Sequence, residues 1–185
     1  DFMEIDKKKI KVVYYGVDKV IKNSAKNEKI NFEKKFHLKK NELIIGCIGR
    51  LVPQKSIKTL IESAVLLKSK IKFKIIIVGD GYQKKFLKNL TIQNCVEDKI
   101  VWIDFLDEVE DFLKFIDIFA LPSLYEGLGL VFLEAMLCKK PIIASNVSAA
   151  KELVKNNYNG FLIKPKNHVQ LYEKILVLNN KKKRI

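Results

Sequence analysis

The stretch IFALPSLYEGLGLVFLEAML, residues 118–137, decides the fold of this chain. Its first four residues are apolar and predict a buried strand over 118–121, which Pro122 ends because proline cannot donate a ladder hydrogen bond. Gly127 and Gly129 then precede a run that predicts a helix over 130–138. A buried strand, a glycine-rich loop and a helix, in this order, are typical of an α/β unit whose loop can approach a ligand closely.

Short apolar runs alternate with longer amphipathic stretches from residue 41 onward. We predict strands over 43–48, 73–78, 100–103, 118–121, 141–145 and 160–163, and helices over 57–67, 82–90, 107–115, 130–138, 149–154 and 168–178. This order predicts an α/β fold: a Rossmann-like parallel sheet of about six strands with helices on both faces. Ligands of such sheets bind at the carboxyl ends of the strands, so the loops after the strands are the candidate site.

The composition is that of a globular protein with a large positive charge. Of the 185 residues, 48% are hydrophobic and 30% are charged, so the chain can bury a core without disulfides or metals. Lys and Arg number 35 and Asp and Glu number 21, which gives a net charge of +14. This charge favours phosphates, nucleic acid or an acidic membrane surface as partners. The excess is almost all lysine scattered along the chain, so a compositional bias is its main expected cause.

The cysteines and the apolar runs exclude several protein classes. Cys47, Cys95 and Cys138 are far apart and form no CxxC motif, so we expect buried, reduced thiols and neither a disulfide framework nor a zinc site. The longest apolar runs are far too short to span a bilayer.

The loops after the first two strands contain glycines and cations. Arg50 and Lys55 follow Gly49 just before a helix N-terminus. Arg can chelate two phosphate oxygens and Lys adds a point charge, so this loop can clamp an anion, although two solvated cations fit equally well. The next loop contains Gly79 and Gly81, but it is neither a GxGxxG nor a Walker motif, and an ordinary turn is the preferred interpretation.

The loop after the fourth strand is the most informative. The amides near Gly129 and Leu130 begin a helix and can hold a phosphate. Glu126 lies in the loop, and Glu134 lies eight residues later in an otherwise apolar helix. A carboxylate there is costly unless it is paired, and sugar hydroxyls are natural partners; a glutamate on a solvent-facing side of the helix is the alternative.

Over about residues 12–178 the chain resembles the C-terminal, donor-binding domain of the family 4 retaining glycosyltransferases (glycosyl transferases group 1), which have the GT-B fold. The spacing of two glutamates separated by seven residues is its most specific part. The blocks that carry the resemblance are Tyr15-Gly16-Val17-Asp18, Gly49-Arg50-Leu51 with Lys55, Val78-Gly79-Asp80-Gly81, residues 123–136, residues 141–145, Glu152-Leu153-Val154 and residues 159–163.

The resemblance implies a role for each motif. Arg50 and Lys55 would hold the donor diphosphate together with the amides at Gly129 and Leu130, and Glu134 would accept the ribose hydroxyls. Glu126 would contact the donor sugar, so Glu126, Arg50 and Lys55 are the expected catalytic residues. The expected nucleotide-sugar-binding residues are Gly49, Arg50, Lys55, Gly79, Gly81, Glu126, Gly127, Leu128, Gly129, Leu130 and Glu134. No metal or other cofactor is expected, because fixed cations and a helix dipole stabilise the departing diphosphate. A UDP-sugar is the favoured donor.

The resemblance also implies an enzyme of which this chain is one part. We expect residues 1–40 to be an interdomain linker and the end of a missing N-terminal domain, residues 41–178 the nucleotide-sugar-binding domain, and residues 179–185 a charged tail. The expected activity is transfer of a hexose to a glycan or lipid-linked acceptor bound by the missing domain, with little transfer by this chain alone. The expected location is the cytoplasm or the inner face of the cytoplasmic membrane, with peripheral contact to anionic lipid and no nucleic-acid partner.

Three alternatives are an epimerase-like GT-B domain acting on sugar nucleotides, an NAD-binding Rossmann domain, and a basic module that binds nucleic acid or a membrane surface. Two segments also depart from the family pattern. Ser56 stands where glycine often follows the lysine, and residues 146–152 are NVSAAKE where the family commonly has DVGGIPE. The second departure leaves the identity of the donor sugar open.

Overall fold

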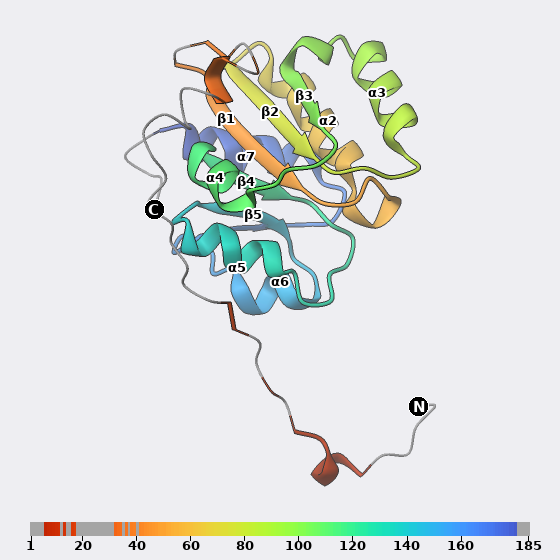
Figure 1. The fold of residues 1–185 in the computed structure, drawn as a ribbon, viewed down its shortest axis with the longest axis vertical. Coiled ribbons are helices and arrows are strands. Elements are labelled where there is room, and N and C mark those ends of the chain that lie inside the picture. Colours follow the sequence, from red (N-terminus) through yellow and green to blue (C-terminus); the bar gives the residue numbers. More distant parts are fainter. Residues whose placement is uncertain are drawn as a thin grey trace.

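A single parallel sheet organises the chain (Figure 1). The computed structural model describes residues 6–11, 13, 16–17, 32–34, 36, 38–39 and 41–180. The strands are β1 (Leu43–Ile48), β2 (Phe73–Val78), β3 (Ile100–Ile103), β4 (Ile118–Leu121), β5 (Ile142–Ser145) and β6 (Gly160–Ile163). All neighbouring strands pair in parallel, in the order β3-β2-β1-β4-β5-β6. The predicted α/β, Rossmann-like fold is therefore confirmed.

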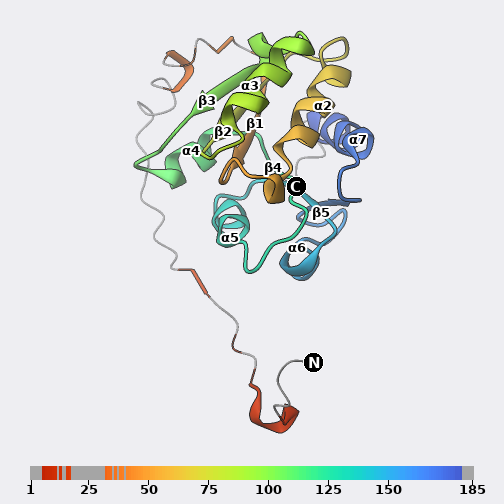
Figure 2. The same ribbon diagram turned by 90° about the vertical axis from the view of Figure 1, so that its right-hand side faces the viewer.

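Helices cover both faces of this sheet. They are α2 (Ile57–Leu67), α3 (Lys84–Gln93), α4 (Val109–Phe115), α5 (Leu130–Leu137), α6 (Ser148–Leu153) and α7 (His168–Asn179), with short 3-10 turns η1 (Lys7–Lys9), η2 (Pro53–Lys55) and η3 (Glu97–Lys99). Figures 1 and 2 show α4 and α5 on one face and α2, α3 and α7 on the other. This arrangement follows from right-handed crossovers between parallel strands.

The core lies between the sheet and its two helical layers. β2, β4 and β5 are buried along almost their entire length, as strands covered on both faces must be. Phe119 of β4 meets Phe132 of α5 edge to face at a ring-centroid distance of 6.0 Å. Such aromatic pairs stabilise a core by about 0.5–1.5 kcal/mol beyond the area that they bury.

Part of the segment that we expected to be a linker packs on this core. Phe32 stacks on Phe115 of α4 with ring centroids 5.2 Å apart, and Phe36 stacks on Phe32 at 6.0 Å. Leu38 also packs against the core. The sequence block at residues 15–18 lies partly outside the described residues, as do most of residues 19–40 and all of 181–185. The expected domain boundaries stay a prediction.

Two helices begin later than the sequence predicts, and for the first of them a tertiary hydrogen bond gives the reason. Helix α3 begins at Lys84 rather than at Tyr82, since the amide of Gln83 donates to the carbonyl of Leu51 at 3.0 Å. Helix α4 begins at Val109 rather than at Asp107. The partner of Gln83 lies more than thirty residues away in the sequence and leaves no local pattern.

The cysteines are free, as predicted, but only Cys47 is fully buried. Burial raises the pKa of the Cys47 thiol to about 12, against a smaller lowering by Lys55. Cys95 is exposed, so the prediction that it is buried was wrong. It follows α3 in a left-handed turn with φ of 51°.

Gly46, in the middle of β1, allows α4 to approach the sheet. A Cβ atom built there would lie 2.5 Å from Cδ1 of Ile116 and 3.0 Å from Cζ of Phe112, both buried side chains. Only a residue without a side chain fits this position without displacing the core.

We therefore expect Gly46→Ala to lower the free energy of unfolding by about 1–3 kcal/mol, the usual cost of overpacking a core. Urea denaturation followed by circular dichroism measures this. Gly16→Ala is the matched control, because a Cβ built at Gly16 meets nothing within 4 Å. Equal stability of the two variants would show that the contact between β1 and α4 is looser than the structure indicates.

Candidate functional site

The order of strands brings the loops after β1 and β4 together. The chain runs from β1 outward to β2 and β3, and then returns to β4 on the other side of β1. The loops after β1 and β4 therefore leave the same edge in opposite directions, and Figure 2 looks onto this edge. A crevice at such a switch point is where ligands bind in open α/β sheets.

Three contacts join these two loops. The amide of Leu124 donates to the carbonyl of Gln54 at 2.7 Å, and Nε2 of Gln54 donates to the carbonyl of Tyr125 at 3.1 Å. Nζ of Lys55 lies 2.6 Å from Oε1 of Glu126. The structure thus brings together Lys55 and Glu126, which the sequence placed 71 residues apart.

The Lys55–Glu126 pair is withdrawn from solvent. The side chain of Lys55 is 14% exposed and that of Glu126 is 5% exposed. Oε1 of Glu126 also accepts a hydrogen bond from Oγ of Ser123 at 2.6 Å. The cost of burying a carboxylate is therefore offset by an opposite charge and a hydroxyl donor.

Arg50 differs from Lys55 in its environment. Its side chain is exposed, and no hydrogen bond or ion pair is recorded for it among the described residues. Gly49 packs against the stem of Lys55, because a Cβ built at Gly49 would lie 3.5 Å from three of its carbons. The loop after β1 thus presents a free guanidinium beside a fixed ammonium.

The N-terminus of α5 supplies backbone amides at the same edge. Gly129 precedes this helix with φ of 65°, in the left-handed region, and a Cβ there would lie 2.6 Å from the ring of Phe132. Gly127, Leu128 and Leu130 are exposed. The first amides of a helix have no intrahelical acceptor, so they are available to an anion.

Glu134 is half-buried on α5, one turn beyond Leu130 and roughly 6 Å along the helix axis from it. No side-chain hydrogen bond or ion pair is recorded for Glu134 within the described part of the chain. It therefore lies on the helix that begins at the site, and no contact between it and the Lys55–Glu126 pair is recorded among the described residues.

Gly79 and Gly81 have a structural reason to be glycine. Both have positive φ, 139° and 158°, and a Cβ at either position would collide with the backbone carbonyl of Gly49 or Leu51. The amide of Leu51 also donates to the carbonyl of Asp80 at 2.8 Å. These glycines let the loop after β2 support the loop after β1, as an ordinary turn would, and their contact with a ligand stays a prediction.

Ser123 and Gln54 were missed by the sequence analysis. Ser123 lies three residues before Glu126, but Ser-x-x-Glu at this spacing predicts a capping box, in which each side chain bonds a backbone amide. The hydrogen bond between the two side chains therefore had no local signal. Nothing local indicated Gln54, because its partners are on the other loop.

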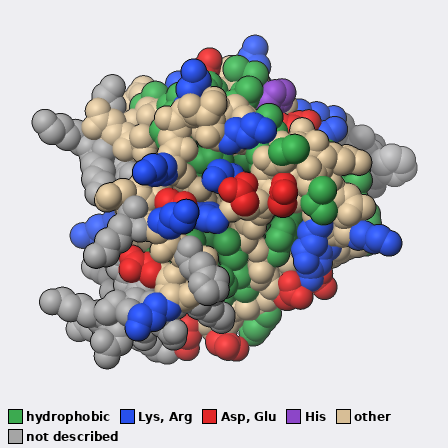
Figure 3. Space-filling model, turned by 90° about the horizontal axis from the view of Figure 1, so that it is seen from above, with side chains coloured by type: hydrophobic (Ala, Val, Ile, Leu, Met, Phe, Trp, Pro, Cys, Tyr) green, Lys and Arg blue, Asp and Glu red, His purple; other side chains and the backbone are tan. Residues whose placement is uncertain are grey.

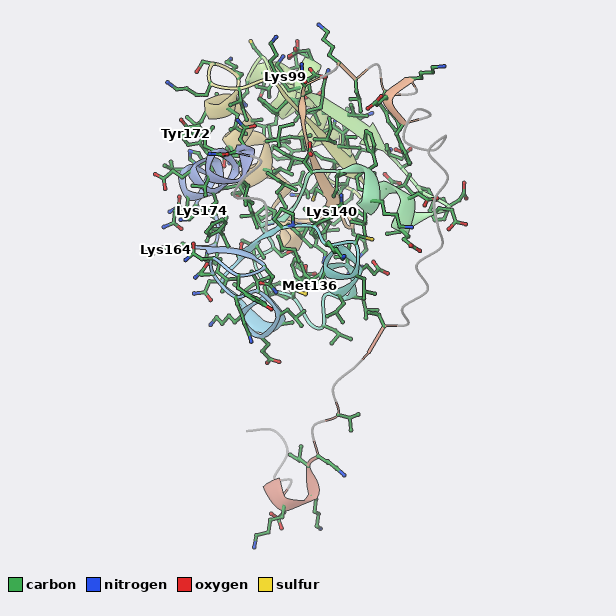
Figure 4. The ribbon with its side chains drawn as sticks, turned by 90° about the vertical axis from the view of Figure 1, so that its left-hand side faces the viewer. Lys99, Met136, Lys140, Lys164, Tyr172 and Lys174 are labelled. Atoms are coloured by element: carbon green, nitrogen blue, oxygen red, sulfur yellow. The ribbon has the colours of Figure 1, made fainter. Side chains whose placement is uncertain are left out.

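A cavity lies at the opposite edge of the sheet, where the strands begin. It has a volume of about 320 Å³ and is lined by Met136, Lys139, Lys140, Tyr158 and Asn159, which precede β5 or β6. Figure 4 looks onto this edge and labels Met136 and Lys140. Nζ of Lys140 donates to the carbonyl of Lys114 at 2.8 Å, so this lysine is already engaged.

Charge and composition of the described residues add three observations. On the face in Figure 3, basic side chains are interspersed with acidic and apolar ones, as the scattered lysines of the sequence suggested. Among the described residues, no three His, Cys, Asp or Glu side chains form a group that could hold a metal. None of the described helices is long and apolar enough to cross a membrane.

Comparison with known proteins identifies the family. The profile of the family described as Glycosyl transferases group 1 matches residues 27–184, so the chain belongs to this family. It is 34% identical over 163 residues to an uncharacterized glycosyltransferase of Methanocaldococcus jannaschii, covering 86% of this chain and 42% of the relative. It is 35% identical over 167 residues to the Escherichia coli UDP-Gal:alpha-D-GlcNAc-diphosphoundecaprenol alpha-1,3-galactosyltransferase, with the same coverages.

Solved structures agree. The fold matches the Anabaena protein HepE in complex with UDP-glucose, with a TM-score of 0.86 and 27% identity over 94% of this chain and 49% of that one. It also matches a glycosyltransferase of Rickettsia africae, with a TM-score of 0.85 and 25% identity over 94% and 48%. These neighbours are GT-B glycosyltransferases, and the chain spans about half the length of the relatives that it matches.

The Lys55–Glu126 pair should contribute measurably to stability, because both charges are largely withdrawn from water. In a double-mutant cycle with Lys55→Met and Glu126→Gln, we expect a coupling free energy on the order of 1–3 kcal/mol, measured by urea denaturation. Lys58 and Glu62 are the matched control, since they form a longer and more exposed pair at 3.7 Å. Their cycle should give about 0.3–0.5 kcal/mol. Equal coupling in both cycles would mean that the first pair is solvated.

Proposed function

We propose that this chain is the donor-binding part of a retaining hexosyltransferase. The donor is a nucleoside-diphosphate sugar, with a UDP-sugar favoured, and the acceptor is a glycan or a lipid-linked sugar. The observation that carries the proposal is that three contacts join the loops after β1 and β4 at the switch point. Lys55 and Arg50 lie there, at the edge of the sheet from which α5 begins. The UDP-glucose in the HepE complex and the UDP-galactose in the name of the E. coli relative support the choice of donor.

The proposed chemistry needs stabilisation of negative charge. Cleavage of the bond between the sugar and the diphosphate leaves charge on the departing nucleoside diphosphate. Arg50, Lys55 and the first amides of α5 stabilise this charge. Lys55 and the amides are already fixed, so they need no reorganisation during the reaction. An ammonium has three N–H donors, so Lys55 can bind a phosphate oxygen while it still donates to Glu126.

Glu126 and Glu134 then recognise the two sugars of the donor. Glu126 accepts from hydroxyls of the transferred sugar, and Glu134 accepts from the ribose. Retention of configuration follows if the acceptor attacks from the face that the diphosphate leaves, with a phosphate oxygen taking the acceptor proton. The acceptor binds to the other half of the enzyme. No metal is required in this proposal, because the protein cations carry out the neutralisation.

The acceptor in the name of the E. coli relative is a lipid diphosphate, and a second relative, from Campylobacter jejuni, is also named for a diphospho-undecaprenol acceptor. This supports a location in the cytoplasm at the inner face of the membrane. A net charge of +14 suits contact with anionic lipid head groups. Nucleic acid is not among the proposed partners.

Nucleotide titration tests the site. We expect Arg50→Ala to weaken UDP binding roughly tenfold or more in calorimetry, because it removes a charge-assisted contact. Glu134→Ala should weaken the binding of UDP and leave the binding of pyrophosphate unchanged, because pyrophosphate has no ribose. Lys70→Ala is the control, since Lys70 is an exposed cation just before β2, at the edge of the sheet opposite to the loops after β1 and β4. GDP and ADP titrations show which base is preferred. If both site variants bind UDP like wild type, the site is misplaced.

Removal of divalent cations tests the proposed independence from metals. The affinity for UDP should differ by less than about twofold between buffers with EDTA and with Mg²⁺, because protein groups supply the positive charge. A tenfold or greater loss of affinity for UDP in EDTA would contradict this part of the proposal. The proposed location of the site would still stand.

A further inference from the structure

The carboxylate of Glu126 is held through one of its two oxygens. Both of its recorded donors, Nζ of Lys55 and Oγ of Ser123, lie 2.6 Å from Oε1. For Oε2, no hydrogen-bond partner is recorded among the residues that the structure describes. One oxygen is therefore anchored by the protein, and the other is left for a further donor.

Ser123 can do little except hold this carboxylate. The residue is only 1% exposed, so water is not an easy alternative partner for its hydroxyl. It follows directly after Pro122 and the last residue of β4, which gives it a rigid base. Its 2.6 Å distance to a carboxylate oxygen is typical of a strong, charge-assisted hydrogen bond.

Lys55 cannot fix the orientation of Glu126 alone if it also binds the diphosphate. Its ammonium is a compact charge on a flexible stem, and its attraction to a carboxylate defines direction poorly. A phosphate would compete with Oε1 for the direction of the ammonium. The hydroxyl of Ser123 is then the contact that fixes the position of Oε1.

We propose that Ser123 is a positioning residue: its hydroxyl anchors Oε1 of Glu126, so that Oε2 stays available to the donor sugar while Lys55 engages the diphosphate. This inference rests on the proposed function. It implies that Ser123 acts on recognition of the sugar and leaves recognition of the nucleotide unchanged.

The test compares UDP with UDP-glucose and UDP-galactose in calorimetry with the whole chain. For the sugar nucleotide that wild type binds more tightly than UDP, Ser123→Ala should weaken binding roughly tenfold. The affinity of the same variant for UDP should stay within about twofold of the wild-type value. Glu126→Gln should reduce the preference for the sugar nucleotide in the same way. The double variant should lose no more than the single ones, because the two residues act as a unit.

Two further variants separate positioning from folding. Ser63→Ala is the matched control: Ser63 is also fully buried, and its Oγ donates to the carbonyl of Leu60 at 2.7 Å, within α2. It should lower the melting temperature without changing the preference for the sugar nucleotide. Ser123→Cys keeps nearly the same shape with a much weaker donor, so it gives the same answer if the alanine variant does not fold.

The outcomes distinguish this inference from the function beneath it. If wild type binds no nucleotide, the proposed function fails. If wild type binds UDP and UDP-sugars equally, or if Ser123→Ala keeps the preference of wild type, the positioning role is refuted and nucleotide binding stands. An equal loss of UDP and UDP-sugar in Ser123→Ala, with Ser63→Ala unchanged, would also refute it, because the hydroxyl would then support the whole loop.

Discussion

The ion pair between Lys55 and Glu126 is the contact on which the geometry of the carboxyl edge depends. It joins the loop after β1 to the loop after β4 at 2.6 Å, with both side chains largely removed from water. A buried charge without its partner is strongly destabilising, so the two loops must move together or remain in place together. The two backbone-directed contacts of Gln54 and Leu124 act in the same direction. The site is therefore a rigid unit made from two segments that are distant in sequence.

The two cations of this edge have different physical roles. Arg50 is exposed and free to attract an anion from solvent, whereas Lys55 is fixed by Glu126 and acts at short range. Fixed charge is more effective for stabilising a transition state, because no reorganisation is needed when negative charge develops. Backbone conformation completes the arrangement. Gly129, with its left-handed φ, begins α5 at the same edge, and Gly79 and Gly81 allow the neighbouring loop to pack on the carbonyls of the first.

All six strands and all six longer helices of the described region were predicted, with the ends of the strands correct to within one residue. This success has a simple cause: a strand covered on both faces is apolar throughout, and an amphipathic helix repeats every 3.6 residues, so both are local patterns. The starts of α3 and α4 were misplaced by two residues, and the burial of Cys95 was wrong. The first of these helix starts depends on a hydrogen bond to Leu51, which no local pattern records. Ser56 illustrates the same limit, since its left-handed φ of 51° could not be recognised from the sequence around it.

The order of residues alone was enough to define the layers of the fold, the loops that contain glycines and cations, and the family to which the chain belongs. It could not order the strands in space, because strand order depends on contacts between segments that are dozens of residues apart. Only the folded chain placed β4 beside β1, and with it Glu126 beside Lys55. The pairing of both Lys55 and Ser123 with one oxygen of Glu126 is likewise a three-dimensional fact, since a carboxylate has two equivalent oxygens until its surroundings make them different.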